Sequence, residues 1–333
     1  MPPGGRVIAL STGTPGQTGF GNRALTIVDR ATWTILRTVP LDGDGRAFLS
    51  RDPQGRLWVA LHGPDDDPDA IARVFSADGD KLLDVPTCTA GHRAVFAAGL
   101  AWVACETNGF VGSYARIDDA DLGPVGTTSF SFSGSDAFTV TAAGLVGGSF
   151  AIAGNIDGGA GVMFFDTTTG VARQRSLGVA SNIRDIVPDG AHGLFLNVFS
   201  ALASPPGSVP DVFDFPDPTA DATGFALAPS PRAGVVVGDE LYVYASAPGA
   251  SHANLARRSS RTGAVTTWPS ALPGAVDQMA TDGASIFLSH AETTSDALDG
   301  LYELDPRNGT LTRRLALPDA TDLIFIPPRA EAP

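Results

Sequence analysis

Seven charged residues recur along the chain at intervals of 43 to 48 residues, each at the start of a short segment that alternates apolar and polar residues. They are Arg46, Arg93, Asp136, Arg184, Arg232, Asp277 and Asp322. The guanidinium of arginine is a planar fork of donors that holds a carboxylate or phosphate through two hydrogen bonds. If the seven segments are equivalent in the fold, these side chains meet at one place. There they bind an anionic ligand or pair with one another.

A second group of residues has the types needed for acid/base chemistry. His62, His92, Glu106, His252 and His290 fall in or beside the connections between predicted strands. A histidine and a glutamate within hydrogen-bond reach of a substrate act as general base and general acid. The sequence does not bring any two of them together, so no catalytic residue is assigned.

The segments that begin with the seven charges are predicted to be β-hairpins. In the first, residues 46–61, two alternating runs flank the turn Asp52-Pro53-Gln54-Gly55, where proline and glycine favour chain reversal. Between these hairpins lies a second kind with a turn of the form Asp-x-x-Thr-Gly, clearest at Asp166–Gly170 and with relatives near residues 29, 76, 118, 217, 259 and 305. Four strands in every 43 to 48 residues are typical of a β-propeller.

The count predicts an all-β fold, a seven-bladed β-propeller of four-stranded antiparallel blades formed by one domain, residues 1–333. The last inner hairpin, at Asp322, lacks its second strand, and residues 6–11 at the other end of the chain form an unassigned strand. We therefore expect the N-terminal strand to pair into the last blade and close the ring. Closure removes two sheet edges that otherwise promote aggregation.

These repeats resemble bacterial seven-bladed propellers of the YVTN-repeat and quinoprotein-like type. The resemblance depends on turns such as Asp166-Thr-Thr-Thr-Gly170 and on inner hairpins such as Asp52-Pro-Gln-Gly-Arg-Leu-Trp-Val-Ala60, and it covers essentially the whole chain. It implies the architecture only, because this family includes binding scaffolds, lyases and sugar-lactone hydrolases.

In this architecture the seven charges ring the mouth of the central channel, and two interpretations of the ring stay open. In one, arginines and aspartates of neighbouring blades form ion pairs that link the blades and block the channel. In the other, Arg46 with Arg93, and Arg184 with Arg232, form positive zones that dock a small anion or an acidic peptide terminus. The long connections on the same face, such as residues 11–22, 62–69, 107–112 and 155–161, make this face the place to seek function.

The two cysteines, Cys88 and Cys105, are predicted to lie at the top of one blade. A disulfide between them fits this placement. The alternative is a metal site formed by the two cysteines and His92, but such a site lacks a fourth ligand. A disulfide implies that the protein is located outside the cytoplasm, in the periplasm or secreted, although the first residues show no export signal.

Composition limits the partners. The net charge is −14, which argues against nucleic acid as the main partner, and no apolar run is long enough to span a membrane. The acidic run Asp65–Asp69 offers oxygen ligands of the kind that calcium uses but lacks the spacing of an EF-hand, so we expect a solvated loop and no cofactor, with calcium as the alternative.

The sequence therefore favours a non-enzymatic binding or scaffold protein that presents the channel mouth to a protein, a peptide or a small anion. The competing class is a propeller enzyme, a lyase or lactone hydrolase acting at the same mouth, with or without a divalent cation.

Overall fold

The computed structural model of the protein describes residues 5–11, 23–41, 46–62, 71–88, 91–107, 111–135, 137–157, 159–178, 181–198, 208–246, 254–269, 272, 275–291 and 298–328. The described residues contain strands and turns and no helix, and hence no helix that could cross a membrane.

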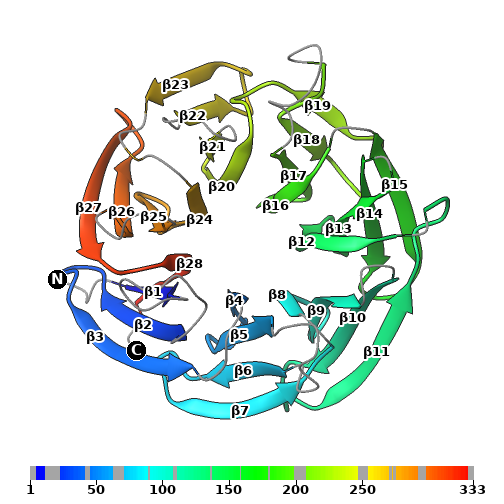
Figure 1. Cartoon of the computed structure of the whole chain (residues 1–333), viewed down its shortest axis with the longest axis horizontal. Helices are drawn as coiled ribbons and strands as arrows, with labels where there is room; N and C mark the ends of the chain where they lie inside the picture. Colours follow the sequence, from blue (N-terminus) through cyan, green and yellow to red (C-terminus); the bar gives the residue numbers. More distant parts are fainter. Residues whose placement is uncertain are drawn as a thin grey trace, which may run out of the picture.

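Seven four-stranded antiparallel sheets stand around a central axis as the blades of a propeller (Figure 1). We number the blades from the one that contains the first strand, and give the strands of each from the axis outward. Blade 1 is β28 (Ala320–Ile326), β1 (Arg6–Ser11), β2 (Arg23–Asp29) and β3 (Ile35–Leu41); blade 2 is β4 (Arg46–Arg51), β5 (Leu57–His62), β6 (Ile71–Phe75) and β7 (Lys81–Pro86); blade 3 is β8 (Gly91–Ala97), β9 (Leu100–Thr107), β10 (Val111–Asp118) and β11 (Pro124–Phe130); blade 4 is β12 (Thr139–Val146), β13 (Ser149–Ile156), β14 (Gly159–Asp166) and β15 (Ala172–Gly178).

The remaining three blades follow the same order. Blade 5 is β16 (Ile183–Asp189), β17 (His192–Asn197), β18 (Val212–Phe215) and β19 (Thr223–Phe225); blade 6 is β20 (Pro231–Val237), β21 (Glu240–Ala245), β22 (Asn254–Ser259) and β23 (Val265–Pro269); blade 7 is β24 (Ala275–Thr281), β25 (Ile286–Ala291), β26 (Gly300–Asp305) and β27 (Thr310–Ala316). The predicted seven-bladed all-β fold is confirmed.

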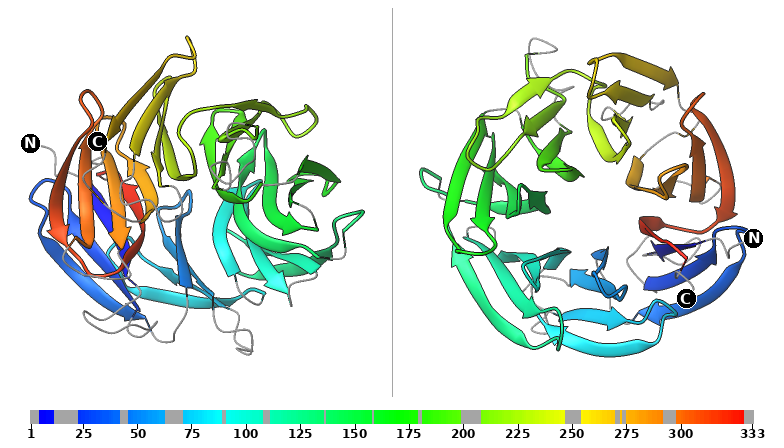
Figure 2. Two further views of the ribbon diagram at one scale, coloured as in Figure 1. Left: turned by 45° about the horizontal axis from the view of Figure 1, so that its top comes forward. Right: turned by 180° about the vertical axis from the view of Figure 1, so that it is seen from behind.

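The ring is closed by strands from opposite ends of the chain. In blade 1, β1 pairs antiparallel with β28 on one side and β2 on the other, with Arg6 opposite Ile326 and Leu10 opposite Asp322. The blue and red strands lie side by side in both Figure 1 and Figure 2. The expected pairing of the N-terminal strand into the last blade is therefore confirmed.

Apolar side chains between neighbouring blades hold the ring together. Seven buried clusters occur, one at each junction of two blades. Large aromatic side chains of the second strands, including Trp58, Trp102, Phe195 and Phe287, are at most 1% exposed in these clusters. Because both faces of every blade meet another blade, the second and third strands are buried on both sides, whereas the outermost strands are largely exposed.

Side-chain hydrogen bonds shape the turns between the two outer strands. In blade 4 the Asp166 carboxylate accepts the backbone N–H groups of Thr168 and Thr169 at 3.0 and 2.7 Å, and these bonds, that from Thr169 foremost, lower the pKa of Asp166. Gly170 ends the turn with a positive φ of 72°. All seven predicted outer turns join an outer pair of strands as expected.

One expected loop proves to be a tight turn. Residues 155–161 were predicted as a long connection, but β13 continues to Ile156 and β14 begins at Gly159. Asn155 and Gly161 both take part in the antiparallel ladder, because small residues allow the two strands to run together to their ends.

Candidate functional site

Six of the seven inner strands contain a β-bulge, and we take the residues at these bulges as the lining of the central channel. At each bulge the inner strand contains one more residue than the second strand opposite it. The first residues of the bulges are His92, Thr141, Arg184, Arg232, Asp277 and Thr321, and the second residues are Arg93, Ala142, Asp185, Ala233, Gln278 and Asp322. A bulge changes the direction in which its side chains point, and these bulges occur at corresponding positions of the six inner strands.

The bulges correct the predicted ring of seven equivalent charges. Arg184, Arg232 and Asp277 are first bulge residues, whereas Arg93 and Asp322 are second ones. In blade 4 the strand β12 begins at Thr139 and its bulge is at Thr141, and Asp136 lies outside the described residues. Arg46 starts β4, which pairs with β5 without a bulge, and its side chain is not among those described.

Sequence reasoning missed Asp185, although a signal for it was present. Two adjacent polar residues, Arg184 and Asp185, stand between the buried residues Ile183 and Ile186. Strict alternation would send one of the two polar side chains into the core, so such a pair indicates a bulge. The same signal marks Thr321 and Asp322, between buried Ala320 and Leu323.

Arg93, Asp185 and Asp322 form a group that we call the plug cluster. One terminal nitrogen of Arg93 lies 3.0 and 3.1 Å from the two carboxylate oxygens of Asp322, and the other lies 3.9 Å from Asp185. Asp322, whose side chain is 4% exposed, also accepts the backbone N–H groups of Leu49 and Leu323, both at 2.8 Å. A buried charge of this kind is tolerated because partners surround it.

Electrostatics in the plug cluster favour one ion pair over the other. Burial opposes the charge of Arg93, but the carboxylates of Asp322 and Asp185 outweigh it and raise the pKa of Arg93. Burial raises the pKa of Asp185, and the opposing effects of Arg93 and of the Ile186 N–H do not cancel it. Asp185 is thus the less well compensated carboxylate of the two.

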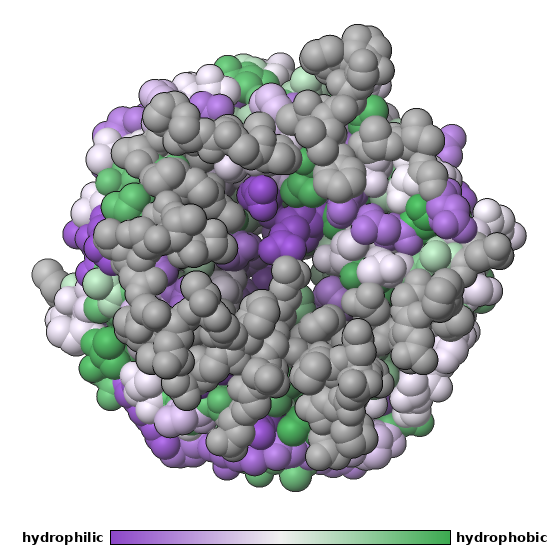
Figure 3. Space-filling view, in the orientation of Figure 1, coloured by the Kyte–Doolittle hydropathy of each residue, from purple (hydrophilic) through white to green (hydrophobic). Residues whose placement is uncertain are grey.

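Arg184, Arg232 and Asp277 form a second group, the mouth cluster. Arg184 donates to Asp277 at 3.3 Å, and both side chains are partly exposed, at 37% and 23%. Arg232 uses its Nε–H to bind the carbonyl oxygen of Ser246 at 3.2 Å. No carboxylate of the described residues forms an ion pair with Arg232. In Figure 3 hydrophilic side chains occupy the centre of the ring, over the inner ends of β16, β20 and β24.

The ion pairs of Arg93 and Arg184 cross the channel. Arg93 in blade 3 reaches blade 1 and blade 5, and Arg184 in blade 5 reaches Asp277 in blade 7. Each pair therefore skips the blade between its partners, which differs from the pairing of neighbours that the sequence suggested. The long arginine side chains span this distance because all the inner strands converge at the axis.

The candidate acid/base residues do not meet within the part of the chain that the structure describes. His92 is buried and stacks on Phe48 of blade 2, with ring centroids 4.8 Å apart. His290 is fully buried in blade 7, with its Nδ1 3.8 Å from Asp299. His252 lies outside the described residues, as do the side chains of His62 and Glu106.

The structure joins Cys88 and Cys105 in a disulfide bond with a Cα–Cα distance of 5.6 Å. Cys88 follows β7 and Cys105 lies opposite Gly91 in the ladder of β8 and β9. The bond therefore fastens the beginning of β8, two residues before Arg93.

Metal-binding groups are not found in the described ranges: no three His, Cys, Asp or Glu side chains there are placed to hold an ion. The acidic run Asp65–Asp69, where calcium was the alternative, lies outside these ranges.

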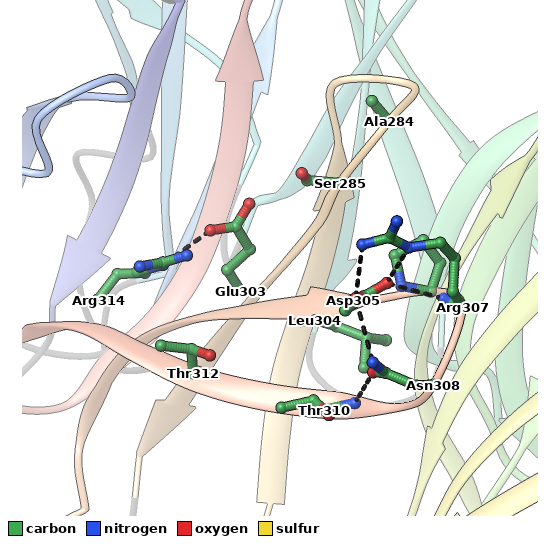
Figure 4. A pocket seen from close by; sticks show the side chains of 11 residues that line it. Ala284, Ser285, Glu303, Leu304, Asp305, Arg307, Asn308, Thr310, Thr312 and Arg314 are labelled. Carbon is green, nitrogen blue, oxygen red and sulfur yellow. Dashed lines mark hydrogen bonds and ion pairs between the residues drawn. The ribbon is translucent and has the colours of Figure 1, made fainter.

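A shallow polar pocket on blade 7 offers no unpaired charge of its own. It is lined by residues of β26 and β27, of the turn that joins them, and of the turn between β24 and β25 (Figure 4). Glu303 binds Arg314 at 2.7 Å and, outside the pocket lining, Arg30 at 2.6 Å, while Asp305 binds Arg307 at 2.9 Å. Because these charges neutralise one another, the pocket is a weaker candidate than the channel mouth.

Comparison with known proteins identifies the fold. No family profile matches the chain, and no curated protein matches its sequence. Among solved structures, a 6-phosphogluconolactonase candidate from Bacteroides fragilis is similar over 96% of this chain and 97% of its own, with 12% identity and a TM-score of 0.67. AztD from Citrobacter koseri covers the same shares at 13% identity and a TM-score of 0.56.

A third similar structure is the dihydro-heme d1 dehydrogenase NirN, with 11% identity, a TM-score of 0.58, and coverage of 98% of this chain and 64% of that one. Identities this low establish the fold and leave the activity open. The resemblance to bacterial seven-bladed β-propellers is thus confirmed as an architecture.

Proposed function

We propose that the protein is a binding protein that holds a small carboxylate ligand at the channel mouth, through Arg232 and Arg184. The observation that carries this proposal is the state of Arg232: its guanidinium lies on an inner strand at the axis, and no described carboxylate pairs with it. A ligand carboxylate would supply the missing counter-charge through two hydrogen bonds.

The distribution of charge supports an anionic ligand at this place. The mouth cluster contains two arginines and one aspartate, whereas the plug cluster contains one arginine and two aspartates. The mouth cluster is therefore a local positive zone in a protein whose net charge is −14. Such a zone attracts small anions selectively, because the rest of the surface repels them.

Binding is preferred over the enzymatic alternative, a lyase or lactone hydrolase, for a geometric reason. Hydrolysis needs an acid and a base at the reacting atoms. In the described part of the chain the two buried histidines lie in blades 3 and 7, where His92 stacks on Phe48 of blade 2 and His290 lies beside Asp299 of its own blade. The 6-phosphogluconolactonase candidates share the fold with this chain at 12% identity, which carries no information about the residues of an active site.

Calorimetric titration of the full chain tests the proposal. The probes are succinate, inorganic phosphate, and a short peptide prepared with a free and with an amidated C-terminus. We expect a carboxylate probe to bind and Arg232→Ala to weaken it at least about tenfold, which corresponds to about 1.4 kcal/mol. Binding of succinate alone identifies a free small acid, and binding of the free but not the amidated peptide identifies a chain terminus.

Arg261→Ala is the matched control, because Arg261 is a surface arginine of the same blade that pairs with Asp239 and is 78% exposed. It should leave the affinity unchanged. Equal affinities of wild type and Arg232→Ala, or the absence of binding by every carboxylate probe, would overturn the proposal.

We also infer that the protein works in an oxidising compartment outside the cytoplasm. The disulfide between Cys88 and Cys105 supports this, since cytosolic thiols are kept reduced. Protein taken from its own cells with free thiols blocked at lysis should contain no blocked cysteine. Two blocked cysteines would contradict the inference.

A further inference from the structure

Asp185 is the least compensated carboxylate of the channel. It is 9% exposed, accepts one backbone N–H, from Ile186 at 2.9 Å, and has its nearest arginine nitrogen 3.9 Å away. Asp322 accepts two backbone N–H groups and lies 3.0 Å from Arg93. Asp277 is more exposed, so water stabilises its charge. A buried carboxylate with few donors is the one that most readily takes up a proton.

The described charged groups that act on Asp185 come from its own strand and from across the channel. Arg184 precedes it on the same strand, Arg93 faces it from β8, and Asp322 adds a like charge from β28. Arg232 is the only ionisable residue of β20, and β12 and β13 contain none. His192 of β17 lies at the opposite end of the blade, opposite Asp189, and pairs with Asp214.

We propose that binding of the anionic ligand at the mouth cluster is linked to protonation of Asp185, so that the protein holds its ligand more tightly in acid than at neutral pH. This inference rests on the proposed function. Asp185 belongs to the plug cluster, yet it directly follows Arg184 of the mouth cluster, so its charge acts on both groups.

The sign follows from the charges in the channel. Among the described side chains of the two clusters, Arg93, Arg184 and Arg232 balance Asp185, Asp277 and Asp322 when all six are ionised. Protonation of Asp185 leaves one positive charge in excess, which favours a bound anion. By linkage, a bound anion also favours the protonated form of Asp185, so binding takes up protons. Burial raises the pKa of Asp185, which brings this protonation toward milder acidity than for an ordinary aspartate.

Titration of succinate into the full chain at about pH 7.5 and about pH 5 measures the linkage as the difference between wild type and Asp185→Asn, because succinate changes its own ionisation over this range and that change is common to both proteins. We expect the affinity of the wild type to rise about tenfold in acid, the size of effect that one nearby unit charge produces at a partly buried site. Repeating the titration in buffers of different ionisation enthalpy should reveal proton uptake.

Asp185→Asn imitates the protonated state and is expected to bind tightly at both pH values, without proton uptake. Asp277→Asn is the matched control: it removes a carboxylate of the same channel that competes for Arg184, so it should tighten binding at both pH values and keep the pH dependence. An unchanged pH dependence in Asp185→Asn would overturn the inference.

A readout without ligand separates this inference from the proposed function. Carboxyl carbon NMR of the wild type should show that Asp185 titrates at higher pH than an exposed aspartate, with Asp185→Asn assigning the resonance. Binding of equal strength at both pH values, or an ordinary titration of Asp185, overturns the linkage alone. If no carboxylate binds the wild type at either pH, the proposed function fails and the linkage fails with it. Should Asp185→Asn not fold, Asp185→Ser serves in its place.

Discussion

The plug cluster and the mouth cluster occupy the same structural position, the bulges of the inner strands, but they use it differently. In the plug cluster Arg93 is enclosed by two carboxylates, and backbone N–H groups complete the bonding of Asp322. In the mouth cluster the one ion pair is longer and more exposed, and Arg232 lacks a described carboxylate partner. The same structural device thus gives one side of the channel closely paired charges and leaves the charges of the other side more exposed, as the proposed ligand site requires.

Asp322→Ala is expected to have the largest effect on stability. It removes the buried carboxylate of Asp322, and so leaves the partly buried Arg93 without its close counter-charge and the Leu49 N–H without an acceptor. Breaking a buried pair in this way costs about 3–5 kcal/mol of the free energy of unfolding. Urea denaturation measures the loss. A loss of less than about 1 kcal/mol would show that the plug cluster has no greater structural role than a surface ion pair.

Removal of the disulfide is expected to cause the second-largest loss in the free energy of unfolding. The bond closes a loop with a sequence separation of 17, which contributes about 3 kcal/mol in the chain-entropy description. The double variant Cys88→Ser with Cys105→Ser should lose this amount in urea denaturation, and wild type with reductant serves as its control. Affinity at the mouth cluster should be kept, because the bond fastens β8. A large loss of affinity would mean that the two clusters are not separate.

Ala98→Gly changes the turn that follows β8, the strand that contains Arg93, and is expected to stabilise the protein. Ala98 lies in the turn between β8 and β9 with a positive φ of 52°, where the corresponding turn of blade 4 uses Gly147. Glycine adopts this conformation without strain, so the free energy of unfolding should rise by about 0.5–1 kcal/mol. Thermal unfolding is the measurement, and a lowered midpoint would contradict the expectation.

Asp277→Ala should have the smallest effect on stability. The Arg184–Asp277 pair is partly exposed, and pairs of this kind contribute about 0–1 kcal/mol. Measured beside Asp322→Ala under identical conditions, it gives the contrast between the clusters directly. Similar losses in the two variants would remove the distinction on which the comparison depends.

The fold was predictable from the sequence because the patterns that specify it lie within short segments of the chain. Each hairpin contains its own alternation and turn residues, such as Asp52–Gly55 and Asp166–Gly170, and the unpaired strand at residues 6–11 predicted ring closure. The site was less predictable, because a bulge inserts one residue and changes which side chain faces the channel. Counting from the hairpins therefore assigned Asp136 where Thr141 lies, and overlooked Asp185.

The pairing across alternate blades was beyond sequence reasoning for a different reason. It depends on the distance between inner strands at the axis, which is set by the packing of all seven blades together. No local pattern around Arg93 indicates that its partners lie 92 and 229 residues away along the chain, at Asp185 and Asp322.

The closure of blade 1 by β28 also sets the order in which the protein assembles during synthesis. A ribosome adds about 5–20 residues each second and releases the C-terminal segment last. Until β28 emerges, β1 has an unpaired edge and Arg93 lacks Asp322. Because β28 follows every other described strand in the sequence, it completes blade 1 and brings Asp322 to Arg93 in one step, so that the nascent chain first passes through an open ring in which Arg93 faces Asp185 alone of its two carboxylates.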